Sequence, residues 1–201
     1  MAPVINRSEV NGRREPPTHI SYQNMPGYKN FAIVGAGITG SFIVHQFLKD
    51  KAAGTVNQVV VLTREVSPAA VAVVFFTPRA YRGMRRQGFK TTIDGDAKVI
   101  PVDYSDKESV KSALAGIDVI ISTIATVALG LQTGIAEAAK EAGVKLFIPS
   151  EFGIPTEGVT EGPFGAKARV RDQLKAVGIP YALFNTGPYA DALWVSYAAA
   201  S

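Results

Sequence analysis

The sequence has no cysteine, and its only two histidines are His19 and His45. The absence of cysteine excludes a disulfide scaffold, thiolate metal sites and a cysteine nucleophile, and it is typical of proteins from a reducing compartment. Two histidines make a zinc site or a Ser-His-Asp triad hard to build. We therefore predict that the protein holds no metal.

Long apolar runs are also absent. A helix that spans a bilayer needs about 20 apolar residues, and the run from Val71 to Phe76 is far too short. The N-terminus has no apolar core behind its charges, as a secretory signal would, and Glu9 and Glu15 argue against a mitochondrial presequence. These features predict a cytoplasmic protein without a membrane partner.

The net charge of +4 is concentrated in two segments. Residues 1–29 carry +2 and residues 66–97 carry +3, so the rest of the chain is close to neutral. A nucleic-acid footprint is a basic patch on the folded domain itself. We therefore predict no nucleic-acid partner.

The 201 residues and the 47% hydrophobic content suffice for one domain with a real core. Residues 1–29 are polar, contain Pro16-Pro17 and Pro26-Gly27, and show no periodicity. They are predicted to form a disordered N-terminal extension. The folded domain is predicted over residues 30–193.

Short apolar runs and helical patterns alternate through that domain. Buried strands are predicted over residues 31–34, 58–63, 99–102, 118–124, 145–149 and 180–184. Helices are predicted over residues 38–50, from 105 onward, over 129–142 and over 164–177. Ser105 and Glu108 match a capping box, while Gly143 and Gly178 are typical helix stops. This alternation predicts an α/β fold with a doubly wound parallel sheet.

Residues 66–97 do not fit the pattern, because a crossover with a short helix needs only about 15–20 residues. Val71 to Phe76 could form a helix or a strand, and the following arginines are typical of a solvated loop: Arg79, Arg82, Arg85 and Arg86. We interpret the segment as an atypical insertion, and a partner-binding role is the alternative.

The glycine loop Gly35-Ala36-Gly37-Ile38-Thr39-Gly40 follows an apolar strand and opens an amphipathic helix. That context is what a dinucleotide-binding loop requires. Gly35 permits the tight turn, Gly37 lets a pyrophosphate approach the backbone, and Gly40 lets the helix pack close to the strand. The helix N-terminus would offer N–H donors to the phosphates. A tight turn without a nucleotide is the alternative.

Arg64 ends the second predicted strand, where an NAD-specific domain usually has an acidic residue that binds the ribose 2′-hydroxyl. An arginine suits a 2′-phosphate instead. Glu65 leaves the alternative open, because its side chain could turn inward. The pattern favours NADPH over NADH as the cofactor.

Lys167 lies on the helix after the fifth predicted strand, at the margin of the stripe formed by Val170, Leu174 and Val177. Near the carboxyl edge of the sheet, a lysine could contact the nicotinamide ribose or donate a proton to a reacting oxygen. A solvated surface charge is the alternative that the residues alone leave open.

Several motifs recur in the order of one known family. They are Ile33–Gly40, Leu62–Arg64, Val102–Asp106, Asp118–Thr123, Pro149-Ser150-Glu151-Phe152-Gly153 and Gly178–Tyr181. Over residues 30–193 the chain resembles the NmrA-like, isoflavone reductase-like branch of the atypical short-chain dehydrogenases, in a form similar to fungal members. The Pro-Ser-Glu-Phe-Gly motif is the most distinctive part.

The resemblance implies a Rossmann fold that binds NADP and a role for each motif. It assigns the pyrophosphate to five residues of the glycine loop: Gly35, Gly37, Ile38, Thr39 and Gly40. Arg64 would bind the 2′-phosphate, Ser122 and Thr123 would lie along the cofactor, and Phe152 would pack near the nicotinamide. Lys167 matches the family's active-site lysine, which serves both cofactor binding and catalysis. Residues 185–189 would begin the substrate side.

Relatives in this family continue well beyond the position of Ser201. Residues 194–201 are therefore expected to be the start of a substrate domain that is mostly absent. The resemblance implies an NADPH-dependent oxidoreductase that acts on an aromatic or phenolic small molecule. Two alternatives stay open: a non-catalytic NADP-binding redox sensor, and a truncated, inactive product.

Overall fold

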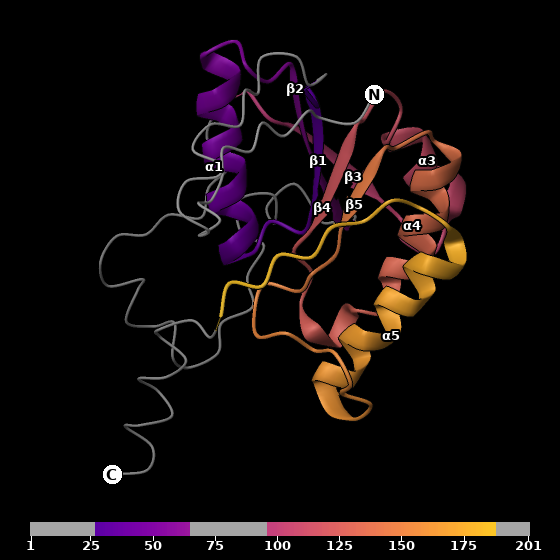
Figure 1. The fold of residues 1–201 in the computed structure, drawn as a ribbon. Helices are drawn as coiled ribbons and strands as arrows, with labels where there is room; N and C mark the ends of the chain where they lie inside the picture. Colours follow the sequence, from indigo (N-terminus) through magenta and orange to yellow (C-terminus); the bar gives the residue numbers. More distant parts are fainter. Residues whose placement is uncertain (1–26, 65–95, 188–201) are drawn as a thin grey trace, which may run out of the picture.

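The fold is an open, all-parallel sheet with helices on both faces, as predicted from the sequence (Figure 1). The computed structural model describes residues 27–64 and 96–187. Its sheet has the order β3-β2-β1-β4-β5. The strands are β1 (Asn30–Val34), β2 (Gln58–Arg64), β3 (Lys98–Val102), β4 (Val119–Ser122) and β5 (Leu146–Ile148).

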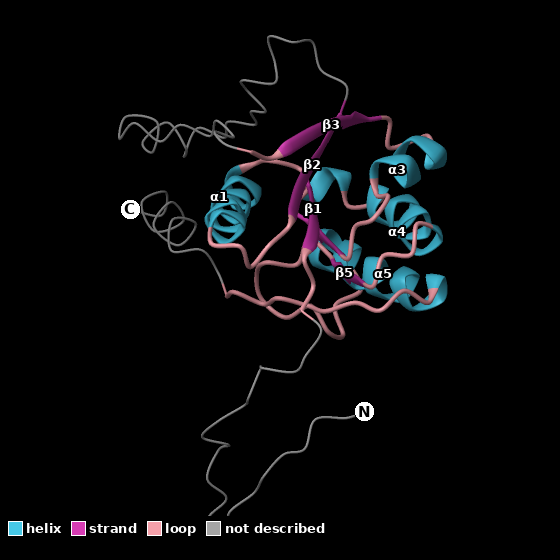
Figure 2. Cartoon of the chain, turned by 90° about the horizontal axis from the view of Figure 1, so that it is seen from above, coloured by secondary structure: helices cyan, strands magenta, loops and turns pink. Residues whose placement is uncertain are grey.

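The helices of the described region cover the two faces unequally. Figure 2 shows α1 (Ile38–Ala52) on one side of the sheet, and α3 (Lys107–Ala113), α4 (Leu131–Glu141) and α5 (Gly162–Val177) on the other. Alternate residues of a strand point to opposite faces. Ala32 and Val34 therefore pack in the core beneath α3, α4 and α5, while Ile33 packs with Val44 of α1. Both faces of the central strands are buried, which explains their unbroken apolar runs.

Two helix C-termini lie where the sequence predicted them, whereas the predicted N-terminal cap of α3 differs from the structure. Gly143 and Gly178 have φ angles of +81° and +72°, in the left-handed region that favours glycine at a helix stop. The capping box predicted at Ser105 is wrong. Asp106 caps α3 instead, and its carboxylate accepts the Glu108 N–H at 3.0 Å. Ser105 donates both its N–H and its hydroxyl to Asp103, in a local turn that competes with capping.

The sixth strand predicted over residues 180–184 is reduced to a single bridge between Tyr181 and Phe147. The Phe147 N–H donates to the Pro180 carbonyl at 2.9 Å, and the Ala182 N–H donates to the Phe147 carbonyl at 3.1 Å. The ladder does not continue along Pro149, because proline has no N–H to donate.

Asp118 ties the starts of three strands together. Its buried carboxylate accepts the N–H groups of Lys29 and Asn30 at 3.0 Å each and pairs with Lys145 at 2.6 Å. Burial raises the pKa of Asp118, but these bonds outweigh burial and lower it below its usual value. Lys29, which the sequence placed in the N-terminal extension, is thus part of the fold.

We expect Asp118→Asn to lower the free energy of unfolding at pH 7 by about 2 kcal/mol, because buried N–H donors lose their charged acceptor. Since folding lowers the pKa of Asp118, its contribution is complete above the aspartate pKa of the unfolded chain, about 4, and is lost at lower pH. Urea unfolding at pH 7 and pH 3 measures both effects. Asp172→Asn, at an exposed ion pair with Lys175, is the control. A variant as stable as wild type at pH 7 would contradict this role.

Candidate functional site

The glycine loop has the geometry that its sequence predicted. Gly35 has a φ angle of +87°, which an L side chain rarely adopts. A Cβ atom on Gly40 would lie 2.2 Å from the Gly35 carbonyl oxygen, so only glycine lets α1 approach β1 this closely. A Cβ atom on Gly37 would meet nothing within 4 Å. The loop is therefore tight where it packs internally and open at Gly37.

The start of α1 is arranged as an anion site. The helix ladder starts with the Ser41 N–H, which donates to the Gly37 carbonyl at 2.8 Å. Among the described residues, no side chain caps this helix, and its first turn contains no acidic residue. Helix N-termini present N–H groups and a positive dipole end to anions. The N-terminus of α1 is thus suited to phosphate groups rather than to a side chain of the protein.

Thr123 and Ser122, at the end of β4, have different environments. The Thr123 hydroxyl donates to the Gly35 carbonyl at 2.5 Å, and its N–H donates to the Val34 carbonyl at 2.8 Å. Thr123 therefore supports the glycine loop from the neighbouring strand. Ser122 is fully buried, and its hydroxyl is the one buried side-chain polar atom of the described region that has no hydrogen-bond partner.

Arg64 ends β2 with an exposed side chain, one strand away from the glycine loop. Nearby, the Tyr104 hydroxyl donates to the Leu62 carbonyl at 2.9 Å, and the same carbonyl accepts the Gly35 N–H. Burial raises the pKa of Tyr104, while the Arg64 charge opposes that rise. Tyr104, for which the sequence indicated no role, therefore fixes the backbone between Arg64 and the loop.

Lys167 lies over the turn that follows β5. Its ammonium donates to the backbone carbonyl of Glu151, and a Cβ atom on Gly153 would lie 3.6 Å from its Nζ. Phe152 has a φ angle of +26°, so the backbone turns sharply between these two contacts. Phe152 is half-buried against the core under β4 and β5. The structure thus brings Lys167 against the Pro-Ser-Glu-Phe-Gly motif, on either side of Phe152 in the chain.

The predicted site residues lie along one edge of the sheet. All five strands are parallel, so the residues that follow them meet at the carboxyl edge. Arg64 is the last residue of β2, the glycine loop follows β1, Thr123 follows β4, and the Glu151 turn follows β5. The carboxyl ends of β2 and β5 are three strand spacings apart, which is roughly 14 Å. The loop and Thr123 flank the switch point between β1 and β4, where dinucleotides bind in open α/β sheets.

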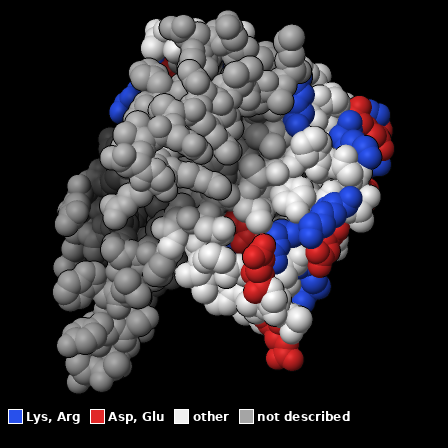
Figure 3. All heavy atoms as spheres, viewed as in Figure 1, with Lys and Arg blue, Asp and Glu red and all other residues white. Residues whose placement is uncertain are grey.

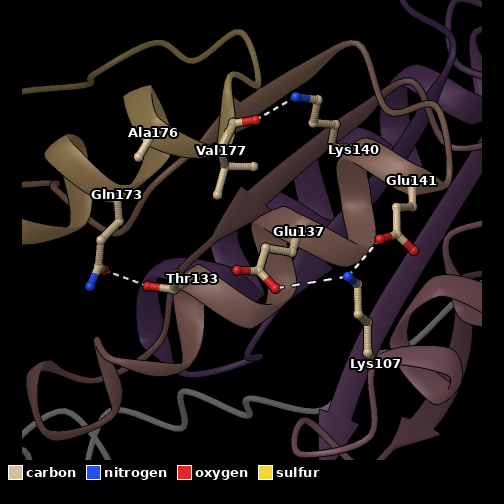
Figure 4. A pocket seen from close by; sticks show the side chains of 8 residues that line it. All are labelled: Lys107, Thr133, Glu137, Lys140, Glu141, Gln173, Ala176 and Val177. Atoms are coloured by element: carbon tan, nitrogen blue, oxygen red, sulfur yellow. Dashed lines mark hydrogen bonds and ion pairs between the residues drawn. The ribbon is translucent and has the colours of Figure 1, made fainter.

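A separate groove of about 630 Å³ lies between α4 and α5, with Lys107 at its margin (Figure 4). Lys140 donates to the Val177 carbonyl at 2.5 Å, and Thr133 donates to Gln173 across the groove. Lys107 pairs with Glu141 at 2.5 Å. The charged groups of the groove thus bind other groups of the groove, and none of its lining residues belongs to the carboxyl edge.

Charges of both signs are mixed over the described part of the face that Figure 3 shows. Lys111 illustrates the mixing, since it pairs with Glu108 at 3.1 Å and with Glu141 at 3.6 Å. None of the described helices is long and apolar enough to span a membrane. The described residues also contain no cluster of three or more metal-ligating side chains.

The comparison with known families identifies the chain. The NmrA-like family model matches residues 28–200. The chain belongs to the NmrA-like family. Among curated relatives, it is 33% identical to isoflavone reductase homolog P3 of Arabidopsis thaliana over 79% of this chain and 48% of the relative. It is also 33% identical to phenylcoumaran benzylic ether reductase POP1 of Populus trichocarpa, over 82% of this chain and 50% of the relative.

Solved structures of this family agree with the fold. AtPrR2 with NADP+ and (+)pinoresinol superimposes with a TM-score of 0.55 and 27% identity, covering 79% of this chain and 50% of that chain. This NmrA-like chain thus spans about half the length of the relatives that it matches. Of the predicted insertion over residues 66–97, the structure describes residues 96 and 97 only. The expected boundary at residue 194 also lies outside the described residues. Those domain assignments stay predictions.

Proposed function

We propose that this chain is an NADPH-dependent reductase of the isoflavone reductase-like type, acting on an aromatic or phenolic small molecule. The observation that carries the proposal is the position of Lys167, whose ammonium contacts Glu151 at the carboxyl edge that also carries the glycine loop and Arg64. A helix lysine held there supplies a proton donor beside a dinucleotide site.

The residues present fit a dinucleotide. The open space at Gly37 and the uncapped start of α1 suit the pyrophosphate, and the positive, exposed Arg64 suits a 2′-phosphate. Thr123 holds the loop in shape, whereas the buried side chain of Ser122 lies beneath the site. The NADP+ in the AtPrR2 structure supports the same choice of cofactor.

When bound, NADPH supplies the hydride that reduces the substrate. Lys167 orients the substrate's reacting oxygen and donates a proton to it from Nζ. Burial lowers the pKa of Lys167 below the usual lysine value, and the negative charge of Glu151 opposes that change. A lower pKa makes the ammonium a better proton donor. Phe152, on the turn that Lys167 contacts, provides an apolar surface for a ring.

The surroundings of Lys167 favour an aromatic substrate. Ile154 and Val159 in the segment between β5 and α5, and Phe164 in the first turn of α5, are exposed, with 37–43% of each residue's surface accessible. Ile154 follows Gly153, which Lys167 contacts, and Phe164 lies one turn before Lys167 on α5. Apolar side chains with a few polar groups are typical of sites for small aromatic molecules. The names of the relatives, which include phenylcoumaran benzylic ether reductases, support this substrate class. The cytoplasmic location expected from the sequence stays a prediction.

We expect Arg64→Ala to weaken NADPH binding about tenfold or more and to leave NADH binding nearly unchanged, because charge-assisted bonds to a phosphate contribute about 2 kcal/mol. Calorimetric titration with both cofactors measures the two affinities. Lys98→Ala is the matched control, because Lys98 lies at the start of the neighbouring strand β3, away from the carboxyl edge. Equal wild-type affinities for NADPH and NADH would rule out the assignment of Arg64.

The reductase activity itself is tested by following NADPH oxidation at 340 nm with a panel of aromatic ketones, enol ethers and benzylic ethers. Oxidation that depends on an added aromatic compound is the expected result. NADPH binding without oxidation of any compound would contradict the reductase proposal and favour a non-catalytic NADP-binding regulator.

A further inference from the structure

Glu151 is buried at the end of the sheet, with 2% of its surface exposed. Burying a carboxylate is costly unless hydrogen bonds and opposite charges compensate for the lost water. Here the hydroxyl of the fully buried Thr156 lies 3.5 Å from Oε2 of Glu151. Within the described part of the chain, this long contact is the one hydrogen bond to the carboxylate, so the cations on α5 must supply most of the compensation.

Two cations on one side of α5 act on the carboxylate through their charge. Lys167 and Arg171 are one helical turn apart, and the charge of each acts on Glu151. Arg171 also donates to the Thr156 carbonyl at 3.1 Å, which fixes the segment that carries the Thr156 hydroxyl. The charged groups of this cluster, which interact through their charges, are Glu151, Lys167 and Arg171.

The backbone of the Glu151 turn also holds Lys167. Its ammonium donates to the Glu151 carbonyl and lies against Gly153. The turn is braced at both ends, since the Glu151 N–H donates to the Pro149 carbonyl at 2.8 Å and the Gly187 N–H donates to the Gly153 carbonyl at 3.1 Å. Glu151 therefore acts on the Lys167 ammonium through two groups. Its carbonyl accepts a hydrogen bond from the ammonium, and its carboxylate carries the opposite charge.

We propose that Glu151 is a positioning residue for Lys167: its carbonyl holds the ammonium at the carboxyl edge, and its buried carboxylate supplies the opposite charge next to the half-buried ammonium. The importance of this pair for reduction rests on the proposed function, whereas the pairing itself does not. In physical terms, burial favours the neutral form of each group, and the charge of each partner favours the charged form. Removal of one charge must therefore shift the titration of the other.

The test measures the titration of Lys167 in the full chain without cofactor or substrate. Acetylation of each lysine by acetic anhydride is followed from pH 6 to 11 by mass spectrometry. We expect Glu151→Gln to lower the midpoint for Lys167 by about one pH unit, since a nearby opposite charge commonly shifts a pKa by about that much. Glu151→Asp, which keeps the charge, should lower it less. Lys175, exposed on the same helix, is the internal control.

Glu157→Gln is the matched control variant, because it removes an exposed carboxylate from the same segment. A midpoint for Lys167 that Glu151→Gln leaves unchanged, or that Glu157→Gln lowers equally, would overturn the proposal. If Glu151→Gln does not fold, Lys167→Met tests the same coupling in reverse, because such coupling is reciprocal. Carboxyl-carbon NMR should then show the midpoint of Glu151 raised by about one pH unit, and an unchanged midpoint would overturn the proposal.

Neither titration involves NADPH oxidation. Failure of the reductase assay would therefore count against the proposed function alone, and an unshifted midpoint would count against the role of Glu151 alone. Where wild type reduces a substrate, Glu151→Gln should also move the kcat profile toward lower pH, which loss of packing alone would not do.

Discussion

Replacement of Lys167 by methionine is expected to lower kcat of the proposed reductase by a factor of about 10²–10⁴, the usual contribution of a positioned proton donor. Methionine keeps most of the aliphatic stem that packs on the Glu151 turn but removes the ammonium that contacts it. The chain should therefore fold while losing the group proposed to protonate the substrate. Stopped-flow and steady-state measurements of NADPH oxidation give kcat and KM separately.

The matched control for this prediction is Lys175→Met. Lys175 lies two turns further along α5, with 64% of its side chain exposed and one exposed ion pair to Asp172. Its replacement should leave kcat and KM unchanged. If Lys167→Met turned over substrate at the wild-type rate, Lys167 would have no part in the chemistry, and the family resemblance would have misled the assignment.

The second large effect is expected at Gly37. Gly37→Ala should weaken NADPH binding at least tenfold while changing the melting temperature by no more than a few degrees. The φ angle of Gly37 is −67°, which alanine adopts readily, and the new methyl group meets no protein atom within 4 Å. The methyl group would instead occupy space proposed for the pyrophosphate, and such overpacking costs about 1–3 kcal/mol.

Gly134→Ala is the matched control, because Gly134 lies within α4, where an added Cβ also meets nothing. That variant should gain up to about 1 kcal/mol of stability from helix propensity and bind NADPH as wild type does. Calorimetry and thermal unfolding on the three proteins separate the effects on binding and on stability. Unchanged NADPH affinity in Gly37→Ala would contradict the placement of the pyrophosphate.

The parts of the fold that depend on local pattern could be predicted from the sequence. The apolar runs at β1 and β2 and the glycine spacing between them require buried strands and a tight loop, and the structure has both. Gly178 ends α5 because a left-handed residue is needed there. In each case the residues that decide the structure are close together in sequence.

Features that depend on a competition between neighbours were less predictable. Ser105 and Asp106 are both good helix caps, and the choice between them was decided by Asp103, which binds Ser105 in a turn of its own. The strand predicted near Tyr181 has suitable residues, yet only a single bridge forms against the short β5. Propensity identified the candidates in both cases, and hydrogen-bond partners selected among them.

In the candidate site, too, local sequence motifs were predictable and contacts between distant residues were not. The sequence singled out Lys167 and the Pro-Ser-Glu-Phe-Gly motif separately, and the structure brings them into contact. The burial of Glu151 could not be predicted, because it depends on Thr156, Lys167 and Arg171, which lie 5 to 20 residues further along the chain. A carboxylate directly after a buried strand was the one signal in the sequence that could have drawn attention to it.

Calorimetric titration of the wild-type chain with NADPH tests the central claim most directly, because the loop, Arg64 and Lys167 acquire their proposed roles only if a dinucleotide binds at the carboxyl edge. The account predicts one NADPH per chain, bound at micromolar concentrations and more tightly than NADH. No binding of NADPH at millimolar concentration to a folded chain would contradict it.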